Sequence, residues 1–178
     1  MATRKTEAID RKELHIGMLG YGFMGKCHSH AFKVIPYIYP EANILPRLLI
    51  ICGRNEEKVR REAGRYGFDE YCTDWQDLVL DRRIDVFYNC GPDPVHPEPC
   101  IAALENGKHV ICEKPLAVSV EVNVCGTRAE GGSSGVGGAA GGLVGEGVAA
   151  VVVGVGGVAF DPLPADFVEL MQAVELFP

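Results

Sequence analysis

Between residues 14 and 115 the chain alternates short apolar runs with longer stretches of helical pattern, and this alternation constrains the fold most strongly. The apolar runs are Leu14–Leu19, Arg47–Cys52, Glu70–Thr73, Asp85–Cys90 and His109–Cys112. Strands separated by helices at this spacing pair in parallel, because each crossover helix returns the chain to the same end of the sheet. The sequence therefore predicts an α/β fold with a doubly wound parallel sheet and helices on both faces, the Rossmann arrangement.

The segments between these strands carry the expected signals of helix starts and stops. Helices are expected from about Met24 to Val34 and over Asn55–Tyr66, Asp74–Asp81 and His96–Gly107. Asn55 and Asp74 are typical N-cap residues, and Gly107 is a typical helix terminator. The run Arg47–Cys52 is almost continuously apolar, which predicts a strand buried on both faces.

The alternation ends after Ser119, where the composition changes abruptly. Residues 122–160 are rich in Gly, Ala and Val, and this segment is expected to order poorly, because glycine loses the most backbone entropy and has no side chain to bury. Residues 161–178 contain a candidate short helix. The expected organisation is a dinucleotide-binding domain over residues 1–121, a low-complexity segment over 122–160 and this C-terminal helix.

Charge and composition exclude several classes of function. The net charge is −7, and residues 121–178 hold seven acidic residues against one basic residue, which argues against nucleic-acid binding. The N-terminus lacks the apolar core of a signal peptide, and the uncharged run Gly147–Phe160 is too short to span a bilayer. The seven cysteines form no CxxC pair, so no disulfide framework and no metal site are expected, and a reducing cytoplasm is favoured.

The stretch Gly20-x-Gly22-x-x-Gly25 follows the first strand and opens the first helix. In a phosphate-binding loop these glycines permit a tight turn, close approach to a pyrophosphate and close packing of helix on strand. The helix start, with Phe23 and Met24, then presents free N–H groups to the phosphates. The sequence predicts dinucleotide binding here; the alternatives are an ordinary glycine turn or a methyltransferase with the same turn.

The end of the second strand bears on the choice between NAD and NADP. An acidic residue is expected there to bind the adenosine ribose, but this chain has Gly53-Arg54-Asn55. An arginine in place of the acid favours tolerance of a 2′-phosphate, because a guanidinium binds phosphate. The cofactor is therefore expected to be NAD or NADP; the alternative is that Arg54 is an exposed turn residue.

Two further clusters, "NCGPDPVHPEP" and "CEKPLA", begin at the carboxyl ends of predicted strands, where ligands of open α/β sheets bind. A lysine at a strand end is able to orient a substrate hydroxyl and to stabilise the alkoxide as hydride leaves. The alternative for Glu113 and Lys114 is a solvated surface pair.

The stretches GYGFMGKCHSHAF and GPDPVHPEPCIAALENGKHVICEKPLA, within about residues 14–121, resemble the N-terminal domain of the Gfo/Idh/MocA oxidoreductases. That family uses NAD or NADP on sugars, inositols and related polyols. The resemblance implies that Lys114 is the active-site lysine and that Glu113 lies near the nicotinamide. It also implies that Pro92 and His96 border the cofactor. Two further positions compare with the family: His28 matches its pattern, and Asp93 stands where it often has Asn.

The family resemblance also implies a second domain that binds substrate and supplies a histidine, whereas this chain has no histidine after His109. The chain is therefore expected to be truncated or frame-shifted and catalytically incomplete; the alternative is a genuine short protein with a Gly-rich arm. In function it is expected to be the NAD(P)-binding domain of a polyol oxidoreductase. The alternative is a non-catalytic module that binds or senses the dinucleotide. The sequence predicts neither the particular substrate nor the oligomeric state.

Overall fold

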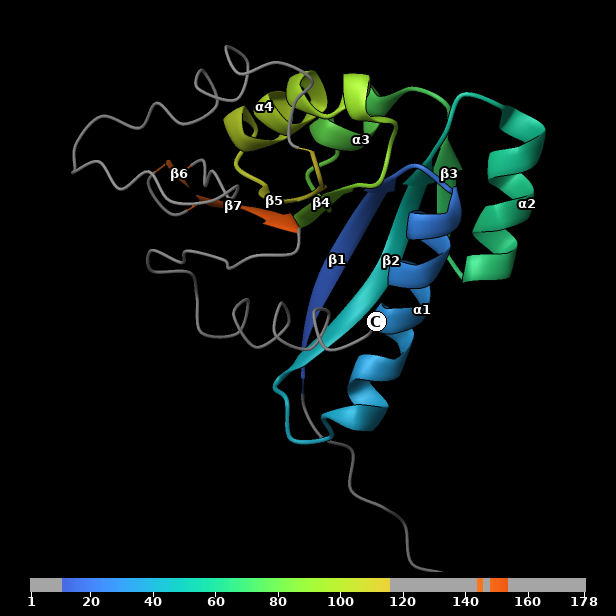
Figure 1. Cartoon of the computed structure of the whole chain (residues 1–178). Helices are drawn as coiled ribbons and strands as arrows, with labels where there is room; N and C mark the ends of the chain where they lie inside the picture. The colour runs from blue at the N-terminus through green and yellow to red at the C-terminus, as the bar shows by residue number, and fades with distance from the viewer. Residues whose placement is uncertain (1–10, 116–143, 146–147, 154–178) are drawn as a thin grey trace, which may run out of the picture.

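The computed structural model describes residues 11–115, 144–145 and 148–153, which form a seven-stranded sheet of order β3-β2-β1-β4-β5-β7-β6 (Figure 1). The strands are β1 (Lys12–Leu19), β2 (Ile44–Cys52), β3 (Glu70–Cys72), β4 (Val86–Asn89), β5 (His109–Glu113), β6 (Val144–Gly145) and β7 (Val148–Val153). The helices are α1 (Phe23–Ile38), α2 (Glu56–Tyr66), α3 (Trp75–Leu80) and α4 (Pro97–Glu105), with the short 3-10 helix η1 (Asp93–Val95) before α4. Strands β1 to β5 pair in parallel, which confirms the predicted doubly wound α/β fold.

The two faces of the sheet are covered by different helix pairs. Ile16 and Tyr88 point to the face where α1 and α2 pack, and they share one buried cluster with Phe32 of α1. Phe87, the neighbour of Tyr88, points to the other face and packs with Leu78 of α3. Successive side chains of a strand alternate between faces, so a strand covered on both faces must be apolar at every position, as β4 is before Asn89.

The helix boundaries follow the predicted capping signals. The Asn55 side chain accepts a hydrogen bond from the Lys58 backbone N–H at 2.9 Å, and the Asp74 carboxylate accepts one from Gln76 at 3.0 Å. Each bond satisfies a donor that the first turn of a helix leaves without a partner. The predicted caps of α2 and α3 are therefore confirmed.

Helix α1 is longer than the sequence pattern predicts, because it continues past Val34 to Ile38 and includes Pro36. The proline lies in the last turn, so the hydrogen bond that its missing N–H removes is one close to the end of the helix. The Tyr39 N–H still bonds to the Ile35 carbonyl at 2.8 Å. The predicted end at Val34 is therefore wrong by about one turn.

Within the Gly/Ala/Val-rich segment the structure describes two short stretches, and both extend the sheet. Strand β7 pairs in parallel with β5, and β6 pairs antiparallel with β7. The valines of β7 suit a strand, because β-branched side chains pack well on a pleated surface. The rest of residues 122–160, and the candidate helix over 161–178, lie outside the described residues.

None of the described helices combines the length and the apolar character that a membrane crossing requires.

The loop between α3 and β4 is fixed to β3 by Arg83, whose guanidinium donates to both carboxylate oxygens of Glu70 at 2.6 and 2.9 Å. The same guanidinium donates to the Asp81 carboxylate at 2.7 Å. Hydrogen bonding from Arg83 holds the pKa of Glu70 below its ordinary value of 4.5 and the pKa of Asp81 below 3.8. These ion pairs therefore stabilise the fold above those values, and the contribution is lost as pH falls through the lowered pKa values.

We expect Arg83→Gln to lower the free energy of unfolding at neutral pH, and we expect this loss to vanish in acid, where both carboxylates are protonated in either protein. Urea denaturation at neutral pH and at acidic pH measures the difference. Arg82→Gln is the matched control, because Arg82 is exposed and makes no ion pair with any residue that the structure describes. An equal loss for Arg83→Gln at both pH values would contradict the ion-pair explanation.

Candidate functional site

The carboxyl ends of β1, β4 and β5 meet at one edge of the sheet, and the predicted site residues follow these ends. Leu19 is the register partner of Asn89, and Asn89 is the partner of Cys112. The Cys90 N–H donates to the Leu19 carbonyl at 2.8 Å, which joins the chain just beyond β1 and β4. This edge is where open α/β sheets bind their ligands.

The predicted glycine turn has three different local geometries. Gly20 has a φ of +101°, and a β-carbon there would lie 2.5 Å from the Cys90 carbonyl oxygen. A β-carbon on Gly25 would overlap the Gly20 carbonyl oxygen, so helix α1 packs tightly on the turn. Gly22 has ordinary backbone angles and open space where its β-carbon would be. Gly20 and Gly25 are therefore required by the fold, whereas Gly22 leaves room for something that the fold does not supply.

The N-terminus of α1 begins at this open space and lacks a capping side chain. Gly22 is the N-cap residue, no side chain bonds to it, and the first turn contains no acidic residue. The N–H groups of a first helical turn carry partial positive charge and are ready to bind an anion. Phe23 and Met24, which begin the helix, are both exposed, with Phe23 at 78%. The structure thus places the predicted phosphate loop at the edge of the sheet, with Gly22, Phe23 and Met24 exposed and Gly25 buried.

The end of β2 lies beside this turn. Gly53 is in contact with the Tyr21 ring, and a β-carbon on Gly53 would overlap that ring. Arg54 is exposed, and Asn55 uses its side chain to cap α2. No carboxylate stands at residues 53–55, and the contact of Arg54 with a 2′-phosphate stays a prediction.

The loop after β4 is organised by a buried amide that the sequence reasoning missed. The Asn89 side chain is fully buried, and its Nδ2 donates to the Val95 carbonyl at 3.1 Å and to the His96 carbonyl at 3.3 Å. Its Oδ1 accepts from the Gly91 N–H at 3.0 Å. The available signal was a polar residue at the end of an apolar strand. Asn89 therefore fixes the loop that carries the predicted residues Pro92 and His96.

His96 is fully buried, and both of its ring nitrogens face backbone carbonyl oxygens. Nε2 lies 2.9 Å from the Gly91 oxygen, and Nδ1 lies 2.7 Å from the Pro115 oxygen. The ring thus connects the loop after β4 with the chain beyond β5. Pro92 and Asp93, by contrast, are exposed on the same loop.

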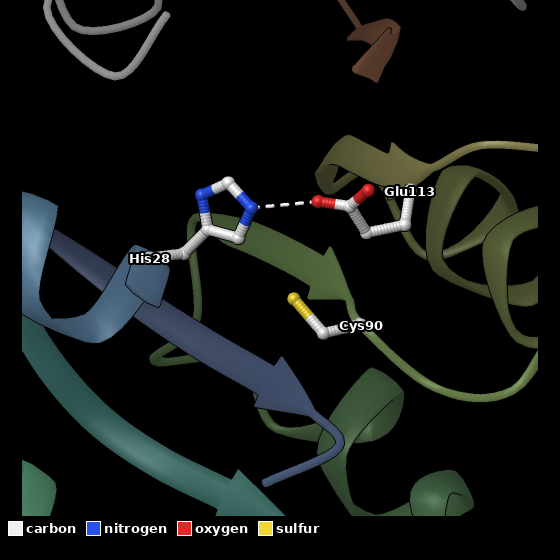
Figure 2. Close-up of side chains that lie close together, drawn as sticks. All are labelled: His28, Cys90 and Glu113. Atoms are coloured by element: carbon white, nitrogen blue, oxygen red, sulfur yellow. Dashed lines mark hydrogen bonds and ion pairs between the residues drawn. The ribbon is translucent and has the colours of Figure 1, made fainter. Parts of the chain in front are cut away.

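At the end of β5, Glu113 is buried and Lys114 is exposed. The Glu113 carboxylate shares a hydrogen bond of 2.6 Å with Nε2 of His28, which comes from α1 (Figure 2). The expectation of a solvated pair therefore does not describe Glu113, which is 7% exposed. His28 and Glu113 are the central buried polar contact of this edge.

Cys90 lies beside this contact, and the Cys90, His28 and Glu113 donor atoms are within 4.8 Å of one another (Figure 2). Burial, with a smaller contribution from Glu113, raises the pKa of the Cys90 thiol well above its ordinary value, so the thiol is neutral. The 2.6 Å contact between His28 and Glu113 is a direct hydrogen bond, because a nitrogen and an oxygen bound to one tetrahedral zinc lie roughly 3.3 Å apart. The arrangement fits a hydrogen-bonded polar cluster better than a set of metal ligands.

The other histidine of α1 does not join this cluster. His30, two residues after His28 on α1, is exposed. The expectation that these two side chains do not share a helix face is confirmed.

A cavity of about 470 Å³ lies at the opposite, amino-terminal edge of the sheet. Its lining includes Lys12, Asp85 and Lys108, and it contains none of the predicted site residues. Burial lowers the pKa of Lys108, whose ammonium group donates to the backbone carbonyls of Asp81 and Ile84. Lys108 therefore serves the fold, and the carboxyl edge of the sheet remains the candidate site.

We expect Asn89→Leu to lower the free energy of unfolding by roughly 2–4 kcal/mol, because it leaves several buried backbone groups without partners. Asn106→Leu is the matched control. Its side chain also donates to a helix carbonyl, that of Ala102 at 2.8 Å, but it is exposed and should change stability by less than about 0.5 kcal/mol. Chemical denaturation measures both values. Equal losses for the two variants would refute the organising role of Asn89.

Comparison with known proteins gives matches over the same part of the chain. Residues 14–124 match the family model of the Gfo/Idh/MocA oxidoreductases, described as an oxidoreductase family with an NAD-binding Rossmann fold. Levoglucosan dehydrogenase of Pseudarthrobacter phenanthrenivorans is 42% identical over 106 residues, which are 60% of this chain and 27% of that protein. Inositol 2-dehydrogenase 1 of Mycolicibacterium vanbaalenii is 30% identical over 118 residues, which are 66% of this chain and 32% of that protein.

Solved structures agree with the sequence matches. Levoglucosan dehydrogenase in complex with NADH aligns with a TM-score of 0.62 at 40% identity, over 64% of this chain and 30% of that one. An oxidoreductase domain protein from Kribbella flavida aligns with a TM-score of 0.60 at 42% identity, over 63% of this chain and 30% of that one. The chain thus spans about a third or less of the length of these relatives. It belongs to the Gfo/Idh/MocA oxidoreductase family, and the region of residues 14–124 is its NAD-binding Rossmann domain.

Proposed function

We propose that the glycine turn and the start of α1 bind the pyrophosphate of NAD(H) or NADP(H), and that Lys114 takes part in hydride transfer at a carbon bearing a hydroxyl group. The observation that carries this proposal is the open space at Gly22, next to a helix N-terminus without a capping side chain. An anion placed there meets unpaired N–H groups and partial positive charge. The residues present therefore fit the dinucleotide that the family is known to bind.

The substrate class that we propose is a sugar or a cyclic polyol. Relatives at 42% and 30% identity are named levoglucosan dehydrogenase and inositol 2-dehydrogenase 1, and one solved relative is a complex with NADH and levoglucosan. When bound, the nicotinamide supplies the acceptor for the hydride that leaves the carbinol carbon. The substrate hydroxyl releases its proton to solvent in the same oxidation, and the product is a carbonyl compound.

We assign to Lys114 the contact with the substrate hydroxyl group. It is exposed, and it directly follows β5 at the same edge as the glycine turn. An ammonium group there orients the hydroxyl and stabilises negative charge on its oxygen as hydride leaves. Phe23 and Met24 are exposed at the start of α1 and are proposed to contact the dinucleotide, as are Pro92 and Glu113.

The domain organisation also remains a proposal. We assign residues 1–121 to the dinucleotide-binding domain, residues 122–160 to a low-complexity segment and residues 161–178 to a short helix. Substrate contacts beyond Lys114 are proposed to come from outside the matched region, because that region corresponds to roughly 30% of each relative. The described cysteines are all free thiols, which supports a reducing cytoplasm as the proposed location.

Gly22→Ala should weaken dinucleotide binding about tenfold or more and leave the fold intact, because the added methyl group fills the space that a pyrophosphate approaches. Gly64→Ala is the matched control. It also adds a methyl group in open space, but on α2, where alanine favours the helix. Calorimetric titration with NADH and with NADPH measures the affinity for each dinucleotide. The ratio of the two affinities tests the proposed contact of Arg54 with the 2′-phosphate. Unchanged affinity in Gly22→Ala would place the dinucleotide elsewhere.

Turnover distinguishes an enzyme from a module that only binds or senses the dinucleotide. With NAD and levoglucosan or inositol, Lys114→Met should lower the rate of NADH formation by about a hundredfold or more, while NADH affinity changes much less. Reduction of NAD is followed by absorbance, and binding by calorimetry on the same samples. Tight binding without any turnover by the unmodified chain would favour the sensing module.

A further inference from the structure

We propose that His28 is a positioning residue: it holds the buried Glu113 carboxylate away from Lys114 and so leaves the lysine ammonium group free to face the substrate. The importance of this arrangement for catalysis rests on the proposed function of Lys114. The arrangement itself rests on contacts of the described residues alone.

The first step of the argument is the burial of the Glu113 carboxylate. Glu113 is 7% exposed, and a buried carboxylate is costly unless it accepts strong hydrogen bonds. His28 supplies such a bond at 2.6 Å (Figure 2). Cys90 lies close by, but its raised pKa keeps it a thiol, which is a weak donor. His28 is therefore the strong partner of the carboxylate in this cluster.

The second step is that the imidazole of His28 is itself held in place. Its ring packs against the Tyr88 ring with centroids 4.8 Å apart, and its exposed fraction is 9%. Tyr88 belongs to the buried cluster that joins α1 to the sheet. Because the ring cannot leave this position without disturbing the core, the carboxylate that it binds is fixed as well.

The third step concerns the chain on both sides of Lys114. Glu113, before it, is held by His28, and the carbonyl of Pro115, after it, is 2.7 Å from Nδ1 of the buried His96. The Glu113 carboxylate is buried and bonded to a residue of α1, whereas Lys114, which follows the last residue of β5, is exposed. His96 therefore fixes the backbone after Lys114, and His28 keeps the Glu113 carboxylate bonded to α1.

The fourth step is what happens without His28. The nearest strong donor left for the Glu113 carboxylate along the chain is the ammonium group of Lys114, and the two would form an ion pair. Such a pair withdraws the lysine from the exposed edge and makes its amine less reactive. Loss of His28 should thus act on Lys114 only through the charge of Glu113.

The experiment measures the reactivity of the Lys114 amine by competitive reductive methylation and mass spectrometry, in the full chain without dinucleotide. His28→Phe should slow methylation of Lys114 about threefold to tenfold, the range that a partly buried ion pair produces. His28→Gln keeps a donor and should react like the unmodified chain. His30→Phe, on the exposed position two residues later, is the matched control and should change nothing.

The double variant His28→Phe with Glu113→Gln decides between positioning and a general structural role. With the carboxylate gone, methylation of Lys114 should return to the rate of the unmodified chain. A rate that stays low in the double variant, or a single variant with an unchanged rate, would overturn the proposal. His28→Met, whose flexible side chain fills the same space, replaces His28→Phe if circular dichroism shows that the phenylalanine disrupts the fold.

Calorimetry with NADH on the same variants keeps this proposal separate from the proposed function. His28→Phe should change NADH affinity by less than about threefold, because the phosphate loop begins before His28 and is held by Gly20 and Gly25. If the unmodified chain binds no NADH, the proposed function fails while the methylation result still stands. If NADH binds and methylation does not respond to His28, only the positioning role fails.

Discussion

The close approach of two backbone segments, at Gly20 and at Cys90, holds the candidate site together. A β-carbon on Gly20 would lie 2.5 Å from the Cys90 carbonyl oxygen, and the φ of +101° at Gly20 is one that other residues rarely adopt. This contact lets the chain turn sharply from β1 into α1 beside the end of β4. Helix α1 then begins at the sheet edge, and His28 reaches the end of β5. Without a glycine at this position, the turn, the helix start and the polar cluster would all be displaced.

The carboxyl edge of the sheet is unusual for its buried polar side chains. Asn89 and Glu113 each end an apolar strand, His96 immediately precedes α4, and all three are buried. Their hydrogen bonds reach backbone groups of the loops or a side chain of α1, which satisfies them in place of water. A network of this kind fixes loops that are otherwise free to move. Exposed residues such as Lys114 and Pro92 thus lie on segments that buried hydrogen bonds hold in place, as a binding or catalytic site requires.

Sequence reasoning predicted the strands and helices of residues 14–115 well, because the signals are local. The caps at Asn55 and Asp74 and the glycine turn each depend on neighbours within a few residues. It was less successful where a weak local signal is overridden, as at Pro36, which lies inside α1. It also missed Asn89, because an amide at a strand end looks the same whether it faces water or binds a loop. The strand β7 lies in a segment whose composition gave little reason to expect one.

The fold class, the glycine turn at the start of α1 and the family were readable from the amino-acid sequence, since they follow from periodicity, glycine spacing and short motifs. Which polar residues meet, by contrast, depends on the packing of distant segments. His28 and Glu113 are 85 positions apart, and His96 and the Pro115 carbonyl are 19 apart. Whether such residues form a buried hydrogen bond or two separate surface contacts depends on strand order, register and the start of α1. Those are properties of the packed sheet, because burial and pairing arise only when distant segments exclude water together.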